Sequence, residues 1–232
     1  MSALYQRLSR LRRLGLLLSC FLLLPLHSLG EELPALQRLR FPETRYTAFQ
    51  GQTVSPVPEV YPEVEPVLTW SSDNPFVAQP LEEGGIACQE VGNALLRCTS
   101  QDASHRSASL RLIVEPALPI AMQTCTWQRG RLVLTVKNRM WETQIQRVTL
   151  EVTCLDAQGE ELTLRTVELS GFHLFAAKVT SLSFTPEAFP EGTVSLRLRI
   201  TEIANWQLTY ALPPLSPEED PRAPVMDCEV PE

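Results

Sequence analysis

The chain has 232 residues and a net charge of −7, and 44% of its residues are hydrophobic. The charge becomes −11 without residues 1–30, because that segment contains four arginines and no acidic residue. Such an acidic surface repels polyanions, so we expect no nucleic-acid partner. The length that remains is about 200 residues, which suffices for one large or two small domains.

Residues 1–30 have the pattern of a signal peptide. Four arginines precede an apolar run, Leu14–Leu26, and Ser28 and Gly30 place small residues where a signal peptidase reads them. The run is shorter than the ~20 residues of a membrane-spanning helix, so we expect cleavage after Gly30. An uncleaved signal-anchor is the alternative, and it would make the membrane a partner through this segment alone. Cys20 resembles a lipoprotein cysteine, but the apolar run continues past it, which favours an ordinary signal sequence.

The mature chain begins with a short lead-in, residues 31–40, which is its one weakly helical stretch. Between residues 41 and 116, short alternating segments separated by glycine and proline predict strands. The expected strands are Tyr46–Phe49, Val67–Ser71, Phe76–Gln79, Ile86–Glu90, Ala94–Thr99 and Ser107–Val114. Short strands at this spacing are typical of a β-sandwich.

A second block of strands, residues 120–212, follows a linker at residues 117–119. Pro116 and Pro119 restrict the backbone there and disfavour a helix. Asp156-Ala157-Gln158-Gly159 lies between two alternating segments and predicts a hairpin turn. The expected strands are Arg131–Lys137, Gln146–Leu155, Leu162–Leu169, Lys178–Phe184 and Val194–Ile203.

The order of these blocks predicts an all-β fold, with two tandem small immunoglobulin-like β-sandwiches after the signal peptide. Residues 213–232 differ from both blocks, because they are rich in proline and acidic residues. They offer too little apolar surface to offset the entropy of ordering, so we expect a disordered or extended tail.

The stretch LTWSSDNPFVAQ, residues 68–79, carries a family resemblance. Together with GGIACQEVGNALLRCTS (residues 84–100) and ASLRLIVEP (residues 108–116), it makes residues 41–116 resemble the group 2 bacterial immunoglobulin-like (BIG2) family. The resemblance implies that Trp70 lies in the core of a sandwich and that the residues after it form a register-setting turn. It also implies adhesion or display at the cell envelope.

The second block has a weaker resemblance. LVLTVKNRMWETQIQRVTLEVTCLDAQGEEL, residues 132–162, is similar to secreted β-sandwich modules of the FxLYD type. Asn138 stands where the first strand of such a module ends in a loop, and LDAQGEEL supplies the hairpin. This resemblance implies a second small sandwich for residues 120–212, as in secreted proteins that carry immunoglobulin-like domains.

Five cysteines follow the signal segment, and exported proteins form disulfides. Cys88 and Cys98 flank Gly92 where the BIG2 family has other residues; if their strands are adjacent and antiparallel, they can form a Cys88–Cys98 bond. We slightly favour Cys125–Cys154 as a second bond, with Cys228 left for an intermolecular bond. A bond from Cys228 to either Cys125 or Cys154 is the alternative. The chain contains no CxxC pair, so a zinc clip is not indicated.

The sequence offers no recognisable catalytic or metal-binding arrangement. His105 and His173 are the only histidines of the mature chain, and neither a G-x-S-x-G nor an H-x-x-x-H motif occurs. The acidic pairs Glu82–Glu83, Glu160–Glu161 and Glu218–Glu219 fall in expected turns or in the tail. We therefore expect a non-enzymatic protein without metal or cofactor.

Trp141 and Trp206 fall in loops, which leaves two interpretations. They form a contact patch for a glycan or a protein, or they fold back over the end of the sandwich. The first functional hypothesis is a secreted or surface-exposed adhesion or cell-envelope scaffold whose partner is a protein or glycan at the cell surface. The second is a carbohydrate-binding accessory module with these tryptophans as its platform. A third is an envelope protein held in the membrane by an uncleaved signal-anchor.

Overall fold

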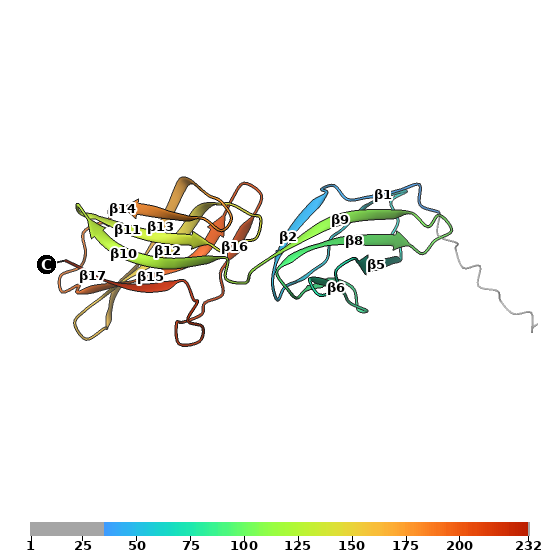
Figure 1. Ribbon diagram of the computed structural model, residues 1–232. Coiled ribbons are helices and arrows are strands. Elements are labelled where there is room, and N and C mark those ends of the chain that lie inside the picture. Colours follow the sequence, from blue (N-terminus) through green and yellow to red (C-terminus); the bar gives the residue numbers. More distant parts are fainter. Residues whose placement is uncertain (1–34, 232) are drawn as a thin grey trace, which may run out of the picture. The chain divides into compact units, whose positions relative to one another are not determined.

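The computed structural model describes residues 35–231, which form β-strands, turns and loops without a helix (Figure 1). The expected signal peptide and Cys20 lie outside the described residues. Within residues 35–231, nothing forms a helix long and apolar enough to cross a membrane. From Leu36 onward the chain forms one compact unit. The all-β class expected from the sequence is confirmed.

The first half, residues 36–115, contains three sheets. The largest has the strand order β2-β9-β8-β5, the second has the order β3-β7-β6, and β1 pairs with β4. The expected helical lead-in is wrong over its last three residues, because they form β1. The strands are β1 (Arg38–Arg40), β2 (Arg45–Phe49), β3 (Thr53–Val54), β4 (Glu59–Tyr61), β5 (Leu68–Ser72), β6 (Ala78–Pro80), β7 (Ile86–Cys88), β8 (Gly92–Ser100) and β9 (Ser107–Glu115).

The core of the first half lies between its two larger sheets. Along β8 the side chains alternate between buried and exposed, so that Ala94 and Leu96 point into the core. Gly92 opens this strand with a φ of +151°, and a Cβ built on it would lie 3.1 Å from Val77. Glycine therefore allows β8 to pack closely against the turn before β6.

The segment LTWSSDNPFVAQ forms a strand and a turn. Trp70 in β5 is partly buried against the core, and its ring centroid lies 5.9 Å from that of Phe41. The Asp73 carboxylate accepts a hydrogen bond from the backbone N–H of Leu95, at 2.7 Å, which ties the turn to β8. The next strand begins later than expected, at Ala78, and Phe76 is exposed.

The second half, residues 120–231, contains two larger sheets. One has the order β10-β11-β14, and the other has the order β13-β12-β15, with β16 and β17 both paired to β15. Each of the five strands expected here overlaps one in the structure. The strands are β10 (Ile120–Gln128), β11 (Arg131–Asn138), β12 (Ile145–Leu155), β13 (Glu161–Leu174), β14 (Val179–Phe184), β15 (Ser195–Ala204), β16 (Thr209–Ala211) and β17 (Val225–Glu229).

The expected disordered tail is wrong for its C-terminal part. Val225–Glu229 forms β17, which runs antiparallel to β15 (Figure 1) with Cys228 opposite Leu196. Cys228 and Ala223 are buried. The physical reason is that β15 leaves unpaired backbone groups on one side, and a strand that pairs with them satisfies both partners.

Candidate functional site

A buried carboxylate joins the end of β9 to the loop before β12. Glu115 is fully buried, and its oxygens accept hydrogen bonds from the backbone N–H groups of Trp141, Glu142 and Thr143. The hydroxyl of Thr143 donates a further bond, at 2.6 Å. A buried carboxylate needs such donors, because leaving it without partners is energetically costly. The four bonds therefore fix the position of this loop.

Glu142 in the same loop is held from its other side by two arginines. Its carboxylate oxygens lie 2.6 Å from the guanidinium of Arg45 in β2 and 2.6 Å from that of Arg111 in β9. The side chain of Glu142 is about three-quarters buried, so solvent screens these ion pairs only in part. The pairs place Arg45 and Glu142 on one wall of a cleft.

The same cleft is lined by a tight turn between β15 and β16. The side-chain oxygen of Asn205 accepts bonds from the backbone N–H groups of Gln207, at 2.8 Å, and Leu208, at 2.9 Å. The side-chain amide of Asn205 donates to the carbonyl of Gln144, at 2.9 Å. Asparagine stabilises turns in this way. The turn displays Trp206, which is 73% exposed.

These segments line a cleft of ≈ 730 Å³, which we call the aromatic cleft. Three aromatic residues line it while remaining accessible to solvent: Trp206, Phe175 at 61% exposed and Tyr46 at 41% exposed. Its polar lining residues are Glu43, Arg45, Thr47, Glu142, Thr143, Gln144, Asn205 and Gln207. The cleft combines apolar faces with hydrogen-bonding groups, as ligand sites do.

Of the two tryptophans singled out in the sequence, only Trp206 lines this cleft. Trp141 is 56% exposed but is not among the residues of the cleft wall, so the expected shared platform of Trp141 and Trp206 is not what the cleft presents. Phe175 and Tyr46 stand in its place. Neither Phe175 nor Tyr46 lies in a sequence motif, so the sequence does not mark either one as a site residue.

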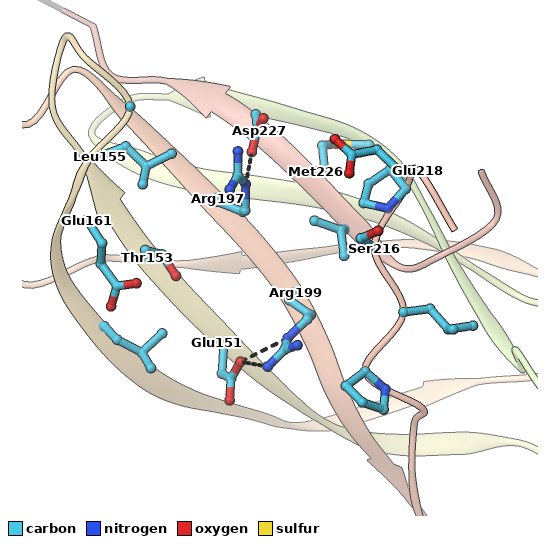
Figure 2. Close-up of a pocket in the computed structure, with 16 residues that line it drawn as sticks. Glu151, Thr153, Leu155, Glu161, Arg197, Arg199, Ser216, Glu218, Met226 and Asp227 are labelled. Carbon is cyan, nitrogen blue, oxygen red and sulfur yellow. Dashed lines mark hydrogen bonds and ion pairs between the residues drawn. The ribbon is translucent and has the colours of Figure 1, made fainter. Parts of the chain in front are cut away.

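A second groove, of ≈ 720 Å³, lies over the outer face of β12, β15 and β17. Figure 2 shows Arg199 pointing toward Glu151, with a shortest separation of 2.5 Å, and Arg197 toward Asp227, at 3.0 Å. Each guanidinium is thus paired with a carboxylate. The groove wall also contains Glu161 and Glu218, so its net charge is negative and the groove does not favour an anionic ligand. These ion pairs connect β15 to its neighbours β12 and β17 on the surface of the sheet.

The five described cysteines are free thiols in the structure. The expected Cys88–Cys98 bond required adjacent antiparallel strands, and this expectation is wrong, because β7 and β8 belong to different sheets. Burial raises the pKa of the Cys88 thiol to about 11. The expected Cys125–Cys154 bond is also not formed: the neighbour of the Cys125 thiol is Cys228.

The remaining titratable groups form no further site. His105 lies exposed in the loop between β8 and β9, and His173 is exposed in β13, with its ring 3.2 Å from the Gln146 amide. Among residues 35–231, no group of three or more histidine, cysteine or acidic side chains is placed to hold a metal ion.

No family model matches the chain, and no curated protein matches it significantly. It is similar to solved structures at low levels. Domains 4 and 5 of the S-layer protein SbsC share 12% identity, with a TM-score of 0.24, over 62% of this chain and 68% of that one. Immunoglobulin domains 1–5 of Sidekick-1 share 14% identity, with a TM-score of 0.27, over 76% and 37%. A DUF4785 family protein from Legionella pneumophila shares 13% identity, with a TM-score of 0.28, over 74% and 54%.

TM-scores of this size carry no argument about function. The all-β class therefore rests on the strands themselves. The resemblances to the BIG2 family and to FxLYD modules stay predictions.

Proposed function

We propose that this chain is an exported, non-enzymatic protein that binds a carbohydrate of the cell envelope or cell surface in its aromatic cleft. The observation that carries the proposal is the exposure of Trp206, Phe175 and Tyr46 on one cleft of ≈ 730 Å³. Large aromatic side chains on a soluble protein normally bury most of their surface, so three accessible rings in one cleft point to a ligand.

The chemistry of the cleft suits a sugar. A pyranose has apolar C–H faces that stack on aromatic rings, and hydroxyls at its edge that both donate and accept hydrogen bonds. The amides of Gln144 and Gln207 can do both, and the carboxylate of Glu142 accepts. Because two arginines already neutralise Glu142, its carboxylate does not require a cationic ligand.

The cleft is also rigid on the side of its polar groups. Glu115 fixes the loop that carries Glu142, and Asn205 fixes the turn that carries Trp206. Groups that are ordered before binding lose less entropy when the ligand arrives, so a preorganised cleft binds more tightly for the same contacts.

Export is supported by the signal-peptide pattern of residues 1–30. The BIG2 resemblance of residues 41–116 supports a place at the cell envelope and a role in adhesion. An acidic, β-rich chain with a glycan site fits both expectations, and the partner would then be an envelope or surface polysaccharide.

The test is a glycan array probed with residues 31–232, followed by calorimetry on the best ligand. We expect Trp206→Ala and Phe175→Ala each to weaken binding about tenfold or more, because each removes a stacking face. Trp141→Ala is the matched control, since it removes an exposed tryptophan outside the cleft and leaves binding unchanged. An array without retained glycans, or equal loss in all three variants, would contradict the proposal.

A second candidate, adhesion to a protein partner, is favoured by the edge of the second sheet. β13 pairs with β12 alone among the described strands, and its outward Leu162 and Leu164 are exposed. An extended peptide can add to such an edge by β-augmentation. Replacing both leucines with lysine would block this mode. Loss of a protein from an envelope pull-down with this variant, while glycan binding persists, would favour the protein partner.

A further inference from the structure

The C-terminal strand closes one side of the second half. β10 is the edge strand of its sheet, and β17 flanks the other sheet; the two strands approach each other closely. The indole N–H of Trp127 in β10 donates a hydrogen bond to the carbonyl of Glu229 in β17, at 2.8 Å. This contact connects two edges that share no backbone ladder.

The same contact brings two cysteines together. Cys125 lies two residues before Trp127, so both side chains leave the same face of β10, and both are partly buried while Thr126 between them is exposed. Cys228 lies one residue before Glu229. The second core contains Cys228, and Cys125 packs against it.

For Cys88, Cys98 and Cys154, no second cysteine thiol is among the groups that shift the pKa. The thiol of Cys228 adjoins that of Cys125. Burial is the largest cause that raises the pKa of Cys125, and the adjacent Cys228 thiol raises it further. Burial raises the pKa of Cys154, against the lowering effects of Arg165 and Thr193, and burial raises that of Cys88.

We propose that Cys125 and Cys228 form an intramolecular disulfide that joins β10 to β17 and fixes the C-terminal strand to the sandwich. Residues of the two strands approach within 8 Å between their Cα atoms, the Trp127 side chain reaches the backbone of β17, and Cys125 packs against the core that contains Cys228. A disulfide requires this kind of close approach. The bond would close a loop of roughly 100 residues, the kind that most restricts the unfolded chain.

The reaction needs an oxidant that carries a disulfide: oxidised glutathione in the test tube, or a dithiol oxidase in an oxidising compartment. The Cys125 thiolate attacks one sulfur of the oxidant, which releases one thiolate and leaves a mixed disulfide. The Cys228 thiolate then attacks the Cys125 sulfur and releases the second thiolate. Two cysteine thiols thus lose two protons and two electrons, and the oxidant becomes two thiols. Persistence of the bond in the cell rests on the proposed export, whereas its formation in the test tube does not.

The experiment is reduction of residues 31–232, reoxidation with oxidised glutathione, and peptide mapping without reductant. We expect a single linked peptide pair containing Cys125 and Cys228, and three remaining thiols of the five. Cys125→Ser abolishes the link, and Cys154→Ser, the matched control, retains it. A Cys125–Cys154 link, a dimer joined through Cys228, or no loss of thiols after oxidation would overturn the proposal.

Thermal unfolding gives a second readout. The oxidised chain should unfold about 8 °C or more above the reduced chain, because the loop is long. This difference in unfolding temperature should vanish in Cys125→Ser. Cys125 is replaced rather than Cys228 because Cys125 is only partly buried, whereas Cys228 is buried. An equal difference in that variant would show that another pair of cysteines had been oxidised. Neither result depends on glycan binding, so the disulfide and the proposed function fail separately.

Discussion

The two halves of the molecule use the same kind of element but differ in how much they bury. The first half packs its two larger sheets around a cluster of nine buried residues, whereas the two sheets of the second half pack around a cluster of twenty. Since stabilisation grows with the apolar area removed from water, the second half is expected to hold most of the free energy of folding.

The boundary between the halves is sharp in the backbone hydrogen bonding of the sheets but not in the packing of the cores. No described sheet takes strands from both halves, which separates them at residues 116–119. Yet Phe49 of β2 belongs to the core cluster of the second half, where its ring stacks on Tyr210 at 3.5 Å. The hydroxyl of Tyr210 donates to the carbonyl of Ala117, at 3.0 Å. The core of the second half therefore includes a side chain from the first half.

The largest effect should come from removing β17. Deletion of residues 222–232 uncovers one side of β15 and removes the buried Cys228, and we expect a loss of roughly 4 kcal/mol or more in the free energy of unfolding. Urea denaturation followed by circular dichroism measures it. Asp227→Asn, which breaks only an exposed ion pair, should change stability by less than about 1 kcal/mol. A truncated chain that unfolds at the wild-type urea concentration would refute the role given to the tail.

A matched pair of core substitutions compares the halves directly. Leu134 in β11 and Leu96 in β8 are both fully buried leucines. We expect Leu134→Ala to lower the free energy of unfolding by about 4 kcal/mol and Leu96→Ala by about 3 kcal/mol, because the smaller core can close more of the cavity. Chemical denaturation of both variants decides the order. A larger effect at Leu96 would reverse the comparison.

The connection between the halves can be weakened at one atom. Glu115→Gln keeps the shape of the side chain but points an amide donor toward the backbone N–H groups from which the carboxylate accepts hydrogen bonds. We expect the free energy of unfolding to fall by about 2 kcal/mol. The loop that carries Glu142 should loosen, so affinity for a cleft ligand should fall as well. Hydrogen exchange of residues 141–143 reports the loosening. Unchanged exchange there would mean that Glu115 does not hold the loop.

The strands of this protein could be predicted from local pattern, since β8, β11 and β12 alternate apolar and polar residues over most of their length. β17 could not, because its five residues stand among prolines and acids and are ordered by the open side of β15. The strands of Cys88 and Cys98 were wrongly expected to be neighbours for a related reason. At Gly92 the chain begins a strand of a different sheet, which local spacing does not reveal.

Of the aromatic residues in the candidate site, the sequence singled out only Trp206, as a loop residue that either forms a contact patch or folds back over the sandwich end. Phe175 and Tyr46 reach the same cleft from distant parts of the chain, so their proximity is a property of the fold. Glu115 ends an apolar strand in the sequence, and its burial depends on three N–H groups from residues 141–143. Such nonlocal partners leave no periodic signal.

The smallest effect concerns the first half alone, at Asp102 in the loop after β8. Its carboxylate accepts hydrogen bonds from the hydroxyl of Ser104, at 2.6 Å, from the backbone N–H of Leu36, at 2.6 Å, and from the hydroxyl of Ser100, at 2.8 Å. These bonds, that of Ser104 foremost, hold the pKa of Asp102 well below its ordinary 3.8.

A carboxyl group with a lowered pKa in the folded state stabilises the protein above its ordinary pKa, and this contribution is lost as the pH falls below 3.8 toward the folded pKa. We therefore expect Asp102→Asn to unfold at a lower temperature than wild type at about pH 7, and the difference to shrink at about pH 2.5. Scanning calorimetry at the two pH values measures it. Ser104→Ala removes the strongest single bond to the carboxylate and should produce a smaller version of the same change. If the unfolding temperatures of wild type and Asp102→Asn differ equally at both pH values, the carboxylate charge is not what orders this loop.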